Sequence, residues 1–197
     1  MTDNFELLKY QLTFNSENDL YFVEILKRKK EHPDISKSVK KVDEFFFTQE
    51  KNFDHYKNKI IEICDLNNAR AYIRVNKRNK QKLALRTLQW VANYIANDQF
   101  DPHLVRKAYS VVAGKYHSED SKKWIVDIDG SDLINQVDII DCIAELEPNQ
   151  DTNKVLFEIP TKNGLHLITS PFRLDHFKNR FPGIDVHKDN PTILYCP

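Results

Sequence analysis

The stretch WIVDIDG, residues 124–130, alternates apolar side chains with carboxylates. Because successive side chains of a β-strand point to opposite faces, the pattern predicts a strand with Asp127 and Asp129 on one face and the apolar residues on the other. Two carboxylates this close repel each other unless a cation lies between them. The stretch therefore predicts a strand that presents two acids to a divalent cation. The alternative is a solvent-exposed edge strand followed by a turn.

A second stretch, TKNGLHLIT at residues 161–169, predicts a tight turn followed by a strand, since Asn-Gly is a strong hairpin signal. His166 lies inside that strand, close to the turn. Backbone N–H groups of such a turn, together with the Lys162 ammonium, can bind an anion. The pattern thus predicts a phosphate site, with an ordinary core or surface histidine as the alternative.

The third stretch, PGIDVHKDNPTILYCP, closes the sequence at residues 182–197. A strand here places Asp185 and His187 on one face and apolar neighbours on the other. Those apolar neighbours indicate a buried carboxylate, which needs a partner or a metal ion. Asp185 is therefore the third predicted acid of a metal site.

Formal net charge is zero, but the charge is unevenly distributed. Residues 1–123 carry a balance of +6 and residues 124–197 a balance of −6, which suits a protein that binds polyanions with one part and cations with the other. No acid occurs between Asp65 and Asp98. Basic residues of this segment are predicted to bind nucleic-acid phosphates, unless they form an ordinary solvated surface: Arg70, Arg74, Lys77, Arg78, Lys80 and Lys82.

The remaining pattern predicts an α+β fold, with a mixed or antiparallel sheet and helices on one face. It divides into a basic N-terminal α/β lobe, residues 1–123, and a C-terminal lobe, residues 124–197, in one compact unit without a flexible linker. Strands are expected at 21–27, 44–48, 71–75, 124–128, 155–159, 165–169, 184–186 and 192–195. Helices are expected at 51–64, 83–95, 102–113, 131–146 and 174–180; the second has an apolar stripe of Leu85, Leu88, Val91, Ala92 and Ile95.

Cysteine and hydropathy patterns exclude several classes of protein. The three cysteines are far apart and form no C-x-x-C pair, which argues against a disulfide scaffold or a structural zinc site. No apolar run approaches the ~20 residues of a membrane-spanning helix. We therefore expect a cytoplasmic protein without a membrane partner.

The order of the three motifs, D-x-D, Gly-x-His and a single Asp, resembles that of the archaeo-eukaryotic primase superfamily. VDIDG is similar to the first motif, NGLHLIT to the second, and GIDVHKDNPTILYCP to the third-motif region of phage and plasmid primase-polymerases. The second is also similar to a stretch in the polymerase domains of bacterial end-joining ligases. The resemblance covers mainly residues 124–197 and implies a catalytic lobe with a sheet like that of an RNA-recognition motif.

The resemblance also implies roles for individual residues. Asp127, Asp129 and Asp185 would be the catalytic acids that hold Mg²⁺ or Mn²⁺, and His166 would contact the phosphates of the incoming nucleotide. The predicted nucleotide-binding set comprises His166, Lys162, Thr161, Asn163, Gly164, His187 and Lys188. Two positions depart from the family pattern: Gly164 stands where many members have Ser, and His187 stands where a basic residue is frequent.

These roles predict a metal-dependent nucleotidyltransferase of DNA replication that adds nucleotides to a nucleic-acid strand. Its partners would be nucleoside triphosphates and nucleic acid, with a DNA template and primer as the expected form. Two other functions are compatible with the same residues. One is a catalytically reduced nucleic-acid-binding accessory module of replication, and the other is a metal-dependent nuclease.

Overall fold

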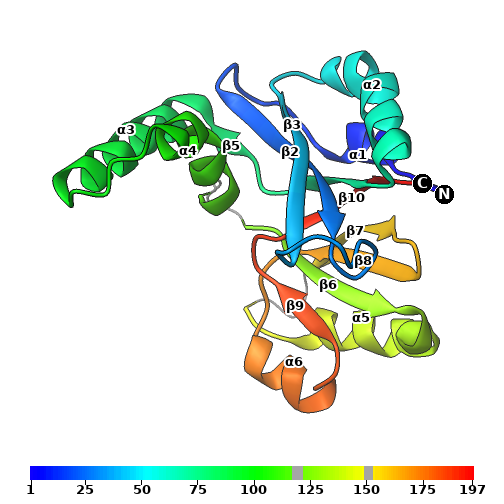
Figure 1. Cartoon of the computed structure of the whole chain (residues 1–197). Helices are drawn as coiled ribbons and strands as arrows, with labels where there is room; N and C mark the ends of the chain where they lie inside the picture. Colours follow the sequence, from blue (N-terminus) through cyan, green and yellow to red (C-terminus); the bar gives the residue numbers. More distant parts are fainter. Residues whose placement is uncertain (117–121, 149–152) are drawn as a thin grey trace.

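Two antiparallel β-sheets form the frame of the chain (Figure 1), in a computed structural model that describes residues 1–116, 122–148 and 153–197. The first sheet has the spatial order β1 (Thr2–Asp3), β10 (Pro191–Cys196), β4 (Arg70–Arg74), β2 (Asp19–Arg28) and β3 (Val39–Phe47), with β5 (Arg78–Asn79) paired to the start of β2. The second has the order β7 (Val155–Pro160), β8 (Gly164–Thr169), β6 (Trp124–Asp129) and β9 (Asp185–His187). The α+β fold class is confirmed.

Helices cover the sheets and also extend away from them (Figure 1). The first sheet packs against α1 (Phe5–Gln11) and α2 (Asn52–Asn67), and the second against α5 (Gln136–Glu145) and α6 (Leu174–Arg180). Two further helices, α3 (Lys80–Ala96) and α4 (Pro102–Lys115), lie side by side as an arm that projects from the first sheet (Figure 1). None of the helices in the described ranges is both long and apolar enough to cross a membrane.

The alternation predicted for residues 124–129 decides how the second sheet packs. Trp124, Val126 and Ile128 are buried in a core that includes Ile143 of α5 and Phe177 of α6. Ile125 instead belongs to the larger core of the first sheet. One face of β6 is therefore covered by helices, and the other face, which carries the acids, is turned toward the first sheet.

The last strand lies in a different sheet from the one expected. The C-terminal lobe was expected to include residues 192–195, but β10 pairs with β1 and β4 of the first sheet. Residues Thr192–Cys196 are all buried, and a strand buried on both faces suits the interior of a sheet. A boundary after residue 123 therefore does not separate the two sheets.

Other elements differ in detail from the sequence expectation. The helix expected over residues 131–146 begins with a 3₁₀ segment, Gly130–Asn135, and becomes α-helical only from Gln136. The short elements β1, α1 and β5 were not expected. Two-residue strands carry too little alternation to be recognised from the sequence.

Candidate functional site

Asp127 lies in the middle of the second sheet, with a candidate residue on each side. It pairs with His166 across β6 and β8, and with Asp185 across β6 and β9. Directly opposed residues of antiparallel strands point to the same face, with Cβ atoms about 4.5–5.5 Å apart. Asp129 shares this face because it is two residues further along the strand. The fold thus brings the residues of all three motifs onto one face.

The His166 imidazole lies between two oxygen atoms. Its Nε2 is 3.4 Å from Asp127 Oδ1, and its Nδ1 is 2.8 Å from Thr192 Oγ1 of β10. The hydrogen bond from His166 lowers the pKa of Asp127, and the positive potentials of His166, His187 and Arg28 act in the same direction against the effect of burial. The Asp127 carboxylate is therefore ionised at neutral pH, as a metal ligand must be.

Asp185 is more exposed than the sequence indicated. Its side chain is 76% exposed, and Oδ1 lies 3.9 Å from Lys178 Nζ. The interpretation of Asp185 as a buried carboxylate is wrong, because β9 is the edge strand of its sheet and its acid-bearing face is open. Apolar neighbours such as Ile184 are buried against the helices instead.

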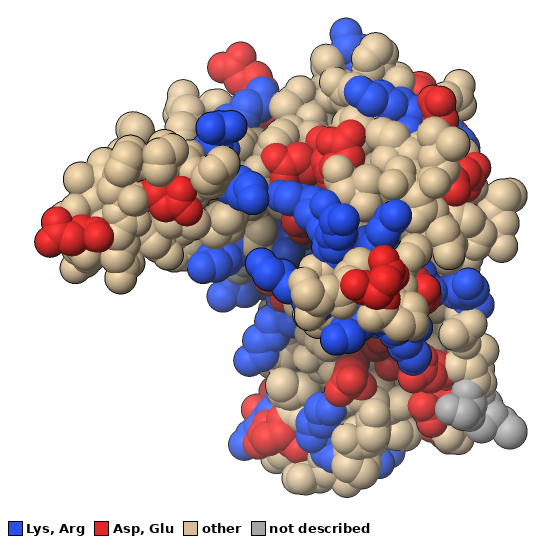
Figure 2. Space-filling view, in the orientation of Figure 1, with Lys and Arg blue, Asp and Glu red and all other residues tan. Residues whose placement is uncertain are grey.

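A cleft of about 450 Å³ opens between the two sheets. Its lining from the second sheet consists of Asp127, Asp129, His166 and the turn residues Thr161, Lys162 and Asn163. The lining contributed by the N-terminal part of the chain includes Arg28, Lys30, Glu31, Arg70 and Tyr72. Figure 2 shows a band of Lys and Arg side chains across the middle of the visible face, directly above Asp and Glu side chains. Acids that can bind a cation thus face a basic wall that can bind phosphate.

Gly164 lets the turn approach the acids closely. A Cβ atom there would lie 2.0 Å from the Ile128 carbonyl oxygen and 3.0 Å from Asp129 Cα. The turn is closed by the Thr161 N–H, which donates to Gly164 O at 2.9 Å, and by the Gly164 N–H, which donates to Thr161 Oγ1 at 3.1 Å. The predicted hairpin is confirmed, but none of the described glycines has a positive φ. Gly164 is needed for space and not for a left-handed backbone.

The predicted nucleotide-binding residues divide into two groups. Thr161, Lys162, Asn163 and His166 line the cleft, whereas His187 and Lys188 do not. Lys188 Nζ lies 5.1 Å from the centre of the Trp124 ring, whose side chain packs on the helix-covered face. A nucleotide contact by Lys188 is therefore not supported, and His187 acts on the site through the pKa of Asp127.

The predicted nucleic-acid-binding residues also divide into one that lines the cleft and others that lie away from it. Arg70 lines the cleft, where its guanidinium forms an ion pair with Glu31. Lys77 is held by Asp19, with Nζ 3.0 Å from Oδ2. Lys80 and Lys82 lie at the start of α3, on the arm.

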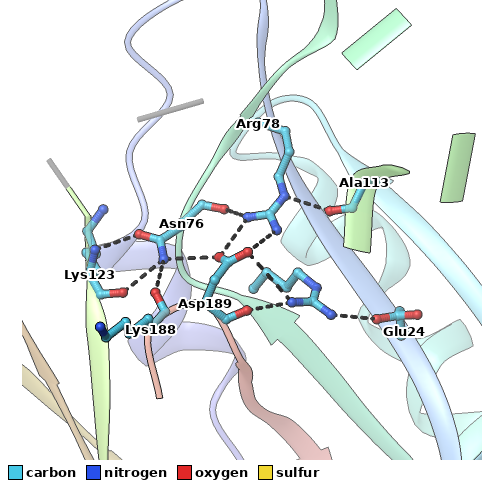
Figure 3. Close-up of polar contacts among 8 residues, drawn as sticks. Glu24, Asn76, Arg78, Ala113, Lys123, Lys188 and Asp189 are labelled. Atoms are coloured by element: carbon cyan, nitrogen blue, oxygen red, sulfur yellow. Dashed lines mark hydrogen bonds and ion pairs between the residues drawn. The ribbon is translucent and has the colours of Figure 1, made fainter. Parts of the chain in front are cut away.

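Asn76 and Arg78 point inward, toward Asp189 (Figure 3), and Arg74, predicted on the same face of the segment, also contacts Asp189. Arg78 is 1% exposed, and its Nη2 is 2.9 Å from Asp189 Oδ2. Arg74 Nη1 donates to Asp189 O at 2.5 Å, and Asn76 Nδ2 donates to Asp189 Oδ1 at 3.1 Å. Asp189 binds both guanidinium groups between the sheets, so the structure gives no support to the prediction that Arg74 and Arg78 bind phosphate.

Several residues of the site were missed by the sequence analysis. Thr192 contacts His166 across the two sheets, and no local pattern marks such a contact. The Tyr72 hydroxyl is buried beside the cleft without a hydrogen-bond partner among the described residues. Arg28 and Lys30, in contrast, belong to the basic run at residues 27–30, which by itself indicates a contact with a template or primer strand, and both line the cleft.

Asp127, Asp129 and Asp185 carry oxygen donors that suit a hard divalent cation, but their side chains do not form a preassembled ligand cluster. Within residues 1–116, 122–148 and 153–197, no group of three His, Cys, Asp or Glu side chains is positioned to hold a metal ion. Carboxylate oxygens are nevertheless the donors that Mg²⁺ and Mn²⁺ prefer, and Asp127 and Asp129 both line the cleft.

Compared with known proteins, the chain matches no family model, no curated protein and no solved structure.

Proposed function

We propose that the chain is a metal-dependent nucleotidyltransferase of the primase-polymerase type, which adds nucleotides to a nucleic-acid strand. The observation that carries the proposal is the register of Asp127 between His166 and Asp185, beside a cleft whose other wall is basic. The second sheet supports it further. Its connections run β6–α5–β7–β8–α6–β9 with both helices on one face, as expected for a lobe like an RNA-recognition motif.

In this proposal Asp127, Asp129 and Asp185 hold Mg²⁺ or Mn²⁺. The bound cation would neutralise phosphate charge and align the reacting oxygens. The reaction joins a primer 3′-hydroxyl to the α-phosphate of a nucleoside triphosphate and releases pyrophosphate. The carboxylates act as ligands and not as nucleophiles, so positioning and electrostatics supply the acceleration.

His166 and Lys162 would bind the triphosphate. At 3.4 Å the hydrogen bond from His166 Nε2 to Asp127 Oδ1 is long and therefore weak, so Nε2 can donate to a phosphate oxygen in its place. When the Thr192 hydroxyl donates to Nδ1, the ring carries its proton on Nε2. Thr192 is therefore a positioning residue for His166.

The opposite wall would bind the nucleic-acid backbone. Arg28 and Lys30 line the cleft opposite the acids, from β2 and the segment that follows it, whereas the Arg70 guanidinium on the same wall is paired with Glu31. Each phosphate contact releases counterions, so binding should weaken steeply with salt, by roughly 10-fold or more for every few contacts.

One observation favours a second candidate function. Asp185 is exposed beside Lys178 and does not line the cleft, as expected for an accessory module that binds nucleic acid without turnover. Such a module would retain salt-sensitive binding through the basic wall.

Primer extension and de novo synthesis, each with Mg²⁺ or Mn²⁺, test the proposal. Longer products that disappear with a chelator and in Asp129→Asn support nucleotidyl transfer. Asp141→Asn, which removes an exposed acid from α5, should leave incorporation unchanged. Shortened strands would indicate a nuclease, and salt-sensitive binding without any incorporation would indicate the accessory module.

A further inference from the structure

Helix α3 has two apolar faces, and only one of them is used within the described chain. Leu83 is buried, and Trp90 packs on the same small core beside α4, with its ring 4.2 Å from that of Tyr94. At about 3.6 residues per turn, these residues form one face. This face packs α3 against the rest of the described chain.

The opposite face of α3 is exposed and uncharged. Leu85, Leu88 and Ile95 are 59%, 69% and 52% exposed, and Ala92 is exposed between them. The spacing of three, four and three residues is that of the a and d positions of a helix seam. All residues of α3 are described, and its three charged residues, Lys80, Lys82 and Arg86, lie outside this stripe. We call Leu85, Leu88, Ala92 and Ile95 the α3 seam.

We propose that the α3 seam pairs with the α3 seam of a second copy of this chain, in antiparallel orientation about a two-fold axis. Centred midway between Leu88 and Ala92, the pairing places Leu85 of one copy opposite Ile95 of the other. It also places Leu88 opposite Ala92, so that in the two Leu88–Ala92 pairs a large side chain meets a small one. This inference does not depend on the proposed function, because the seam lies on the arm and contributes nothing to the cleft lining.

Charges at the two ends of α3 favour a second copy of this chain as the partner of the α3 seam. Lys80 and Lys82 lie at the start of α3, and Asp98 and Asp101 follow its end. Figure 2 shows the arm as mostly tan, with acidic side chains at its tip and basic ones near its base. The antiparallel pairing places Lys82 of one copy beside Asp98 of the other, twice per dimer, and opposes the two helix dipoles.

The seam is poorly suited to nucleic acid. A phosphate-binding face needs Lys or Arg side chains, and the seam has neither. Exposed apolar side chains at helical spacing are instead typical of a helix that docks against another helix. Two heptads form a short seam, so the dimer should be weak and concentration-dependent.

Sedimentation of the full chain at physiological salt, from about 1 µM to roughly 1 mM, tests the pairing. We expect a reversible monomer–dimer equilibrium that Leu88→Glu shifts to monomer by 10-fold or more in Kd. Leu66→Glu is the matched control, since Leu66 is 79% exposed on α2, and it should leave the equilibrium unchanged. Lys82→Glu and Asp98→Lys should each weaken the dimer, and the two together should restore it.

Cysteine cross-linking tests whether the two α3 helices pair in antiparallel orientation. The three native cysteines are buried, so introduced thiols give a clear readout. Leu85→Cys and Ile95→Cys lie about 15 Å apart along one helix and cannot react within it. Antiparallel pairing predicts a disulfide when the two single variants are mixed, and little disulfide when either variant is oxidised alone.

A monomer at every concentration overturns the proposal. So does a dimer that survives Leu88→Glu, cross-linking of Leu85→Cys with itself, or a Leu88→Glu variant that loses only nucleic-acid binding.

Discussion

The charge of Asp127 is stabilised by its neighbours even without a bound cation. Repulsion from the other acids was expected to dominate, but the pKa of Asp127 is lowered, chiefly by the hydrogen bond from His166. Asp127→Asn should therefore lower stability slightly and not raise it. The side chain is 37% exposed, so solvent screening limits the loss at pH 7 to less than about 1 kcal/mol. Urea unfolding at pH 7 measures this difference.

The way in which the stability difference between the wild type and Asp127→Asn changes with pH follows from the lowered pKa of Asp127. A carboxyl with a lowered folded-state pKa contributes stability above its unfolded pKa of about 3.9, and this contribution disappears as pH falls through the folded value. The stabilities of the wild type and Asp127→Asn should thus begin to converge at about pH 4 and become equal only below the folded-state pKa. If the variant is the more stable protein at pH 7, repulsion dominates and our account of the carboxylate is wrong.

The same substitution separates stability from function. Loss of one metal ligand should reduce incorporation on the order of 10³-fold, which is about 4 kcal/mol of activation free energy, while the fold is retained. Asp141→Asn controls for the removal of a charge. An Asp127→Asn protein that unfolds, or that retains full incorporation, would show that the acid is structural.

Among the elements, the contact between β6 and β8 depends on a missing side chain. The Cβ of Gly164→Ala would lie 2.0 Å from the Ile128 carbonyl oxygen, which is backbone and cannot swing away. The strands must separate where Asp129 opposes Gly164, two residues from the Asp127–His166 pair, and overpacking of this kind costs about 1–3 kcal/mol. Gly183→Ala is the control, since a Cβ atom at that position would meet no atom within 4 Å beyond its own chain neighbours. Equal melting temperatures for the two variants would contradict the argument.

Local patterns predicted most elements and the relation among the candidate site residues. Alternation in WIVDIDG predicted which side chains of β6 are buried, because a strand has only two faces. Periodicity cannot indicate what covers a face. The apolar stripe of α3 was predicted correctly as a stripe, yet it is exposed. Arg74 and Arg78 share the predicted face, yet that face is turned toward Asp189.

Contacts between distant segments could not be predicted in the same way. Asp185 was expected to be buried because its neighbours are apolar, but β9 is an edge strand, and the position of a strand in a sheet is not a local property. Thr192 reaches His166 only because β10 returns to the first sheet. The residues with recognisable chemistry were found from the sequence, and those that position them were not.

At the scale of the whole molecule, Asp189 joins the two sheets. It lies between β9 and β10, and its carboxylate is bound by Arg78 and Asn76 from the segment after β4. Asn76 also binds the start of the second sheet: its Nδ2 donates to Lys123 O at 2.9 Å, and its Oδ1 accepts from the Lys123 N–H at 2.6 Å (Figure 3). One polar cluster thus fixes the strands that carry Asp127 and Asp185 relative to the basic wall of the cleft.

Asp189→Ala should therefore be among the most destabilising single changes in a polar residue. Arg78 is 1% exposed and would lose its two contacts with the Asp189 carboxylate, while the contact of its Nε with Ala113 O at 2.8 Å remains. Breaking a buried ion pair from one side costs about 3–5 kcal/mol, because the remaining buried charge loses the partner that compensates it. The exposed pair Arg173–Glu147, 3.2 Å apart, is the control, and Glu147→Ala should cost less than about 1 kcal/mol.

The double variant Asp189→Ala with Arg78→Met decides whether charge or packing explains the loss. Removing the Arg78 guanidinium together with the Asp189 carboxylate removes both charges of this ion pair, so the double variant should be more stable than Asp189→Ala alone. Urea unfolding of the four proteins in this cycle gives the coupling energy. If the losses of stability measured for Asp189→Ala and Arg78→Met add up to that of the double variant, Asp189 acts through the shape of the turn, and the ion pair does not contribute. A positive coupling, with nucleotide incorporation lost in Asp189→Ala and partly regained in the double variant, would show that this contact sets the geometry of the cleft.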